Sequence, residues 1–192
     1  MSSDAPLLPR GFSLIELMIA VALLAVLLSI AAPSFVGYMD RARLRGAVDD
    51  TVSLIAAART EAVKRSRNVT ISLGGASAAS WCIGANEAAT PAAAAQFAAS
   101  TACDCTSDSA CFVDGSRRVL AGTEYGGVTA PVRTASVTVD GKQGTNVSLD
   151  TASFNLVSPR GTYQLQIQVS PLGQARACIP SGQPEMAGYP AC

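Results

Sequence analysis

The stretch PRGFSLIELMIAVALLAVLLSIAAPSF, residues 9–35, decides how this chain is built. Between Phe12 and Phe35 its only ionisable side chain is Glu16. At about 1.5 Å per residue, a helix over residues 12–35 is about 36 Å long, more than the roughly 30 Å hydrocarbon core of a bilayer. We therefore expect a membrane-spanning helix. An unpaired charge inside such a span costs a few kcal/mol, so Glu16 needs a partner.

Three interpretations of this segment differ in what they offer Glu16. A secretory signal would be cut after Ala31 or Ala32. Such signals have a shorter apolar core than this segment and a basic start, and they do not carry an acid inside the apolar run. A plain membrane anchor leaves the carboxylate unpaired. Removal of the leader after Gly11 gives Phe12 a new α-ammonium, which can neutralise Glu16 within one chain or between neighbouring chains. The third interpretation is favoured because it supplies the missing charge.

The run GFSLIELMIAVALLAVLLSIAAPSF closely resembles the leader and first helix of type IV pilins and type II secretion pseudopilins. The resemblance implies that prepilin peptidase cleaves between Gly11 and Phe12 and methylates the new terminus at Phe12. It also implies that Glu16 docks the subunit against other pilin-like subunits. Pro33 falls where these helices often carry a proline, and it lacks the N–H of a helical hydrogen bond. We therefore expect a kink near residues 30–37.

The basic residues that flank the segment and the cysteines that follow it indicate opposite orientations in the membrane. One basic residue, Arg10, precedes the span and three follow it, at Arg41, Arg43 and Arg45, which by the positive-inside rule places the C-terminus in the cytoplasm. Six cysteines, all beyond the span, indicate an oxidising compartment. We follow the cysteines and the resemblance, which predict a single pass through a bacterial inner membrane with the C-terminal part in the periplasm.

Beyond the span, apolar residues recur at helical spacing as far as about Arg67. They are Leu44, Val48, Val52, Ile55 and Ala62. This stripe is expected to pack on the body of the same protein, and a partner helix is the alternative. The predicted organisation is a cleaved leader over residues 1–11, a helix over 12–67 that is transmembrane over about 12–35, and a β-rich head over 68–192.

The head shows the alternation of half-buried strands. Between residues 163 and 170, Tyr163, Leu165, Ile167 and Val169 alternate with glutamines. Further strand candidates are residues 68–73, 117–122, 127–133, 136–141, 153–158 and 172–179. Short connections imply antiparallel pairing. Residues 90–100 form a short helix or an Ala-rich loop. The predicted fold class is α+β, a long kinked N-terminal helix packed on an antiparallel sheet.

The head also has a resemblance of its own. The segments ARTEAVKRSRNVTISL, WCIG, FNLVSPRGTY and VSPLGQARAC resemble GspH/FimT-type minor pilins and pseudopilins, whereas residues 84–147 match nothing distinctive. This resemblance implies a minor, tip-proximal subunit of a type IV pilus or a type II secretion pseudopilus, and it leaves the choice of machine open. It agrees with the fold class predicted from the residues.

The cysteines allow a metal site or a set of disulfides. A zinc or redox site at Cys103, Cys105 and Cys111 would need a more regular spacing, and the chain has no histidine to complete it. Disulfides are favoured instead, among these three cysteines and Cys82, with the pairing left open. The pair Cys178–Cys192 is favoured, closing a C-terminal loop. No metal or cofactor is expected.

Composition favours a structural protein over an enzyme. Histidine, the commonest general base, is absent, and no nucleophile elbow or phosphate-binding loop is present. A DNA- or surface-binding tip module is the alternative function, because some FimT-type pilins use a C-terminal Gly-Arg-x-Arg motif for DNA. Here that motif is reduced to Gly173, Gln174, Ala175 and Arg176, so that Arg176 is the one candidate for ligand binding. The formal net charge of zero provides no general attraction for DNA.

Overall fold

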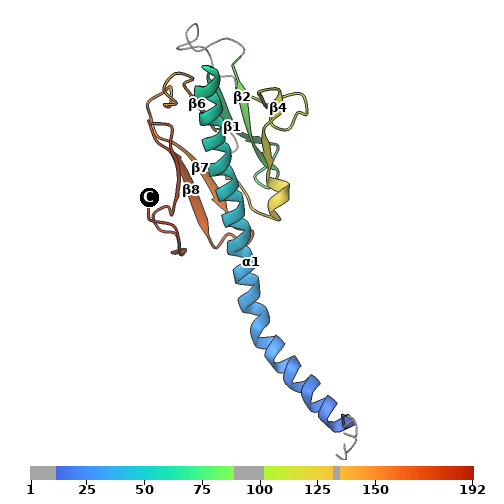
Figure 1. The fold of residues 1–192 in the computed structure, drawn as a ribbon. Helices are drawn as coiled ribbons and strands as arrows, with labels where there is room; N and C mark the ends of the chain where they lie inside the picture. The colour runs from blue at the N-terminus through green and yellow to red at the C-terminus, as the bar shows by residue number, and fades with distance from the viewer. Residues whose placement is uncertain (1–11, 89–101, 132–134) are drawn as a thin grey trace, which may run out of the picture. The chain divides into compact units, whose positions relative to one another are not determined.

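The computed structural model describes residues 12–88, 102–131 and 135–192 (Figure 1). The chain divides into two units, the first ending at Met39 and the second running from Asp40 to Cys192. Helix α1, Leu14–Arg65, belongs to both. The strands are β1 Val69–Gly75, β2 Trp81–Glu87, β3 Phe112–Val113, β4 Ser116–Arg117, β5 Val119–Ala121, β6 Ala135–Val139, β7 Ala152–Val157, β8 Gln164–Val169 and β9 Ala175–Cys178.

Helix α1 contains 52 residues and ends two residues before the expected Arg67. Ser66 ends it in the left-handed region at φ 53°, and the backbone N–H of Arg67 donates to the carbonyl oxygen of Ala62 at 3.1 Å. This backward bond satisfies a terminal carbonyl in the manner of a helix C-cap. The helix therefore stops because the chain reverses at Ser66 and enters β1.

Among the described residues, no single helix is long and apolar enough to cross a membrane. The stretches Leu14–Ile30 and Ser34–Arg65 meet those criteria together, with a bend of 46° at the break between them. Pro33 lies in that break. A span over about 12–35 and a kink caused by Pro33 stay predictions.

The second unit confirms the α+β class, with the Asp40–Arg65 part of α1 lying across antiparallel strands (Figure 1). One sheet has four strands in the order β5-β2-β1-β6, and a second has three in the order β7-β8-β9. Strands β3 and β4 form a separate hairpin. The predicted stripe of α1 packs on the sheets of the same unit, since Leu44, Val48 and Ile55 are each 0% exposed.

Most strand candidates correspond to observed strands, and one is wrong. Residues 127–133 do not form a strand over their described part, where Thr129 makes an isolated bridge to Val157. Gly126 and Gly127 have φ of 47° and 95°, which turns the chain before a strand can extend. The prediction for residues 90–100 lies outside the described residues.

Strand β2 was not predicted, although it is central to the four-stranded sheet. Its first residue, Trp81, is 1% exposed, and the indole N–H donates to the carbonyl oxygen of Val128 at 2.8 Å. The ring also stacks on Tyr125, with ring centroids 5.9 Å apart. A Cβ at Gly122 would lie 2.5 Å from the indole ring, so this position requires glycine. Packing around Trp81 thus joins β2 to the 3-10 helix η2, Gly122–Tyr125.

Candidate functional site

The first described residues form an apolar segment, residues 12–30, whose large side chains are exposed on every face of the helix. Phe12 is 82% exposed, and consecutive residues such as Leu23 and Leu24 are 61% and 55% exposed. A helix that is apolar all round is stable when a membrane or other helices surround it. Among the described residues of its own unit, nothing covers the apolar side chains of this segment.

Glu16 is the one charged side chain of the apolar segment, and it occupies the first turn of α1. The backbone N–H of Leu17 donates to the carbonyl oxygen of Ser13 at 3.1 Å, so the helical turn is already formed around Glu16. An acid at this end interacts favourably with the helix dipole. The sequence from Phe12 to Met39 contains no lysine or arginine. Gly11, the predicted cleavage residue, lies outside the described residues.

Two sequence-family models match the chain, one within each of its two units. The prokaryotic N-terminal methylation motif matches residues 9–32, which include the apolar segment and Glu16. The type II transport protein GspH matches residues 47–173, which is more than half of the chain. This chain belongs to the GspH family. The predicted resemblance to pilin-like proteins is thereby confirmed, and the GspH match continues through the stretch of residues 84–147 in which no resemblance had been found.

Among solved structures, this GspH-family chain is similar to two crystal structures of the type IV minor pilin FimU from Pseudomonas aeruginosa. The first is 18% identical, with 74% of this chain and 91% of FimU covered and a TM-score of 0.44. The second is 18% identical, with 69% and 90% covered and a TM-score of 0.43. No curated protein matches the sequence.

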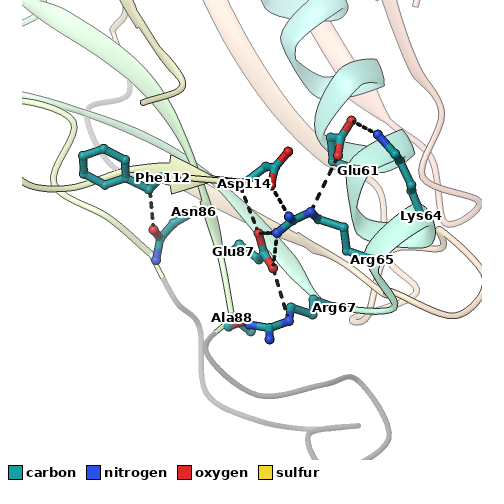
Figure 2. A network of polar contacts seen from close by, with 9 residues as sticks. All are labelled: Glu61, Lys64, Arg65, Arg67, Asn86, Glu87, Ala88, Phe112 and Asp114. Atoms are coloured by element: carbon teal, nitrogen blue, oxygen red, sulfur yellow. Dashed lines mark hydrogen bonds and ion pairs between the residues drawn. The ribbon is translucent and has the colours of Figure 1, made fainter. Parts of the chain in front are cut away.

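The end of α1 is fixed to the head by a network of charges (Figure 2). The Arg65 guanidinium donates to both carboxylate oxygens of Glu87, at 2.9 and 3.2 Å, and also to Asp114. Arg67 forms an ion pair with Glu87 at 3.3 Å. These partners raise the pKa of the Arg65 guanidinium against a lowering by desolvation, and the side chain stays protonated. The network connects α1 to β2 and to the turn between β3 and β4.

Sequence reasoning missed this network, and no local pattern could have revealed it. The bonded residues lie 22 and 49 positions apart, whereas charge patterns read from a sequence report on neighbours three or four residues apart. Glu87 and Asp114 also lie on elements that the sequence did not predict, β2 and the β3–β4 turn. The role of these residues in this GspH-family head is to hold the helix end in place.

The six cysteines form three disulfides within the described residues: Cys82–Cys105, Cys103–Cys111 and Cys178–Cys192. The last is the pair that the sequence favoured. The first two lie together, and a Cβ at Gly84 would contact the sulfur atoms of Cys103 and Cys111 at 3.1 and 2.4 Å. Cys82–Cys105 attaches the loop after residue 102 to strand β2, and Cys103–Cys111 closes that loop on itself. Within the described chain no cluster of three or more His, Cys, Asp or Glu side chains is arranged to hold a metal ion.

Arg176, the candidate for ligand binding, lies in β9 and is exposed. Its guanidinium donates to the Gln168 side-chain oxygen at 3.0 and 3.3 Å. Gln168 in turn donates to Gln166 at 2.9 Å, which gives this face of the three-stranded sheet a row of connected polar groups. Because the partner of Arg176 is a neutral amide, its positive charge is not neutralised there.

Proposed function

We propose that this GspH-family chain is a minor pilin-like subunit that is cut between Gly11 and Phe12, N-methylated at Phe12 and assembled through its N-terminal helix. One observation carries the proposal. The methylation motif, residues 9–32, coincides with an exposed apolar segment whose one charge is Glu16. A chain that keeps a single acid in such a segment needs a cation that its own neighbouring side chains do not supply.

Cleavage supplies that cation. Removal of residues 1–11 leaves an ammonium on Phe12, and positions four apart lie on one face of a helix. The ammonium can therefore approach Glu16 of the same helix or of an adjacent subunit. In a low-dielectric setting such a pair selects one register between helices, even when its net energy is small. The apolar side chains around it supply the dispersion contacts between helices in the membrane and in the assembled filament.

Two features of the second unit, its disulfides and the contacts of its arginines, support the proposed periplasmic orientation of the head. Three disulfides in the second unit support a periplasmic head. The arginines that suggest the opposite orientation make contacts inside this unit: Arg43 donates to the Gly126 carbonyl at 3.1 Å, Arg45 donates to the Ala187 carbonyl at 2.6 Å, and Arg41 lies 5.8 Å from the Tyr163 ring centroid. We infer that they serve the head and do not retain it in the cytoplasm.

The matched family is described as a type II transport protein, which supports a place in a type II secretion pseudopilus. A type IV pilus is the alternative machine, because leader and helix serve both. Deletion of the gene distinguishes the two. Loss of protein secretion with normal surface pili supports the pseudopilus, and loss of pili with normal secretion supports the pilus.

Glu16→Gln tests the proposal because it removes the charge and keeps the shape. We expect the variant to reach the membrane fraction and to be cut, but to be absent from the assembled filament fraction. Ser29→Ala is the matched control, since its hydroxyl donates to the Val26 carbonyl of the same helix at 2.7 Å. It should assemble normally. Mass spectrometry of the wild-type protein should find N-methylated Phe12 at the terminus. Another terminus, or normal assembly of Glu16→Gln, would overturn the proposal.

A second candidate function is DNA or surface binding by the head at the filament tip. The uncompensated charge of exposed Arg176 favours it. Binding through phosphates weakens steeply as salt rises. Salt-dependent DNA binding by the full chain in detergent, lost in Arg176→Ala, would support this function. Absence of binding at low salt would remove it.

A further inference from the structure

A groove of about 550 Å³ runs between α1 and one edge of the four-stranded sheet. Its apolar lining includes Leu54, Ala57, Val119 and Leu120. The volume falls within the range of about 300–1,000 Å³ typical of ligand pockets, which combine an apolar surface with a few placed polar groups. The polar groups of this groove come from opposite walls, with Glu61 on α1 and Arg118 next to β5.

Strand β5 forms the rim of the groove and is an edge strand, because β2 is its one neighbour among the described strands. The Ala85 N–H donates to the Arg118 carbonyl at 2.9 Å, and Gly84 is the residue opposite Val119. Main-chain groups alternate in direction along an antiparallel strand. The N–H and C=O of Val119 therefore point away from β2. In the described parts of the chain no hydrogen bond to either group is recorded.

Each wall carries a charged side chain with polar atoms that have no hydrogen-bond partner among the described residues. The Oε2 atom of Glu61 is buried and has no hydrogen-bond partner among the described residues, with Arg65 Nε 4.0 Å away, whereas its Oε1 atom accepts from Lys64 at 3.5 Å. On the opposite wall Arg118 is exposed, and the structure records no side-chain hydrogen bond or ion pair for it over the described residues. Its neighbour Arg117, by contrast, donates to the carbonyl oxygens of Cys105 and Ser107.

We propose that this groove receives an extended segment of a neighbouring pilin-like subunit, which adds to the open edge of β5 and places a carboxylate against Arg118. An extended segment fits because Val119 offers a main-chain donor and acceptor in the direction in which a further strand would pair. Apolar side chains of that segment would cover Leu54 and Leu120, and one of its N–H donors would satisfy Glu61. The inference rests on the proposed function, since assembly keeps neighbouring subunits at high local concentration.

A photo-crosslinking experiment in native cells tests this inference. A benzoylphenylalanine is placed at Ser53, which is exposed and lines the groove, and in a second strain at Ala56, which is exposed on the same helix but does not line it. The crosslinked peptides are identified by mass spectrometry. We expect Ser53, and not Ala56, to crosslink to a segment of a pilin-like subunit that contains an acidic residue.

A charge reversal then tests the predicted ion pair. In the Ser53 strain, Arg118→Glu should lower the crosslink about tenfold or more, because like charges would face each other. Arg160→Glu reverses an exposed arginine that is outside the groove lining and should leave the crosslink unchanged. The alternative is that Arg118 only protects the sheet edge from aggregation. Equal crosslinking in both variants, or a crosslink to a protein of another class, would overturn the inference.

The presence of the subunit in the assembled filament fraction distinguishes a failure of this inference from a failure of the proposed function. A subunit that assembles normally but gives no crosslink at Ser53 would disprove the groove contact and leave the assembly role intact. A subunit that is absent from every assembled fraction would disprove both. Incorporation with a specific, charge-sensitive crosslink would support both.

Discussion

One helix carries two kinds of surface in this protein. Before Met39 its leucines are exposed, as at Leu24, which is 55% exposed, whereas after Asp40 they are buried or partly buried, as at Leu44, which is 0% exposed. Both parts are rich in good helix formers, so helix propensity does not distinguish them. What differs is the pattern: the first part is apolar all round, and the second has one apolar stripe that the sheets cover.

This difference shows how one helix can serve two roles. The stripe after Asp40 is satisfied within the chain and contributes to the stability of the head. The surface before Met39 is exposed, the methylation motif lies there, and under the proposed function it contacts a membrane or other subunits. If the proposed function holds, stability and assembly depend on different parts of α1, and substitutions in the two parts should have separable effects.

Leucine-to-alanine substitutions in the two parts of α1 provide the most direct test. Leu44→Ala should destabilise the head by about 2–5 kcal/mol, because it removes a fully buried side chain and leaves a cavity. Leu24→Ala should leave head stability unchanged. The chain has one tryptophan, Trp81, which is buried in the head, so its fluorescence during denaturation of the detergent-solubilised protein reports on that unit. Similar losses in both variants would contradict the division.

The C-terminal loop offers a second test of the comparison between the two units, since all three disulfides lie in the unit that begins at Asp40. Replacing Cys178 and Cys192 together with serine should lower the unfolding free energy of the head by about 3 kcal/mol at most, the entropic estimate for a loop of about 15 residues. The effect is bounded because Ile179 and Pro190 remain joined by a backbone bond of 2.8 Å. Ser181→Ala, an exposed change in the same loop, is the control. An unchanged denaturation midpoint in the double variant would show that the backbone bonds alone hold the loop.

The sequence was sufficient to predict those helices and strands that have one buried face and one exposed face. The alternation from Gln164 to Val169 predicted β8, whose burial alternates in the same way. The α1 stripe was predicted for the same reason. Both depend on an element that is buried on one side and open on the other.

The sequence did not predict a strand that is buried on both faces, or contacts between residues that lie far apart in the chain. Strand β2 is buried continuously from Trp81 to Ala85, so it shows no alternation, and its glycine and alanine do not suggest a strand. The pairing of Cys82 with Cys105 depends on how β2 meets the following loop, which spacing does not determine. The N-terminal methylation motif, by contrast, was recognisable because its signal is local and contained in one short stretch, and the roles of Phe12 and Glu16 within it stay predictions.

The smallest expected effect concerns Tyr189, whose hydroxyl donates to Asp49 on α1 at 3.1 Å. Burial, followed by the charge of Asp49 and this hydrogen bond, raises the pKa of Tyr189 to about 12. An unfolded tyrosine titrates near 10, so the stabilisation is complete below pH of about 10 and is lost as the pH rises towards 12. Tyr189→Phe should cost about 0.5–1 kcal/mol at neutral pH and reduce the loss of head stability between those pH values. Tyr38→Phe, before Met39, should change neither quantity when Trp81 fluorescence is followed. A pH profile in Tyr189→Phe as steep as in the wild type would show that the bond to Asp49 does not stabilise the protonated tyrosine. Helix α1 would then be held to the C-terminal loop by apolar packing and by the Arg45 bond to the Ala187 carbonyl.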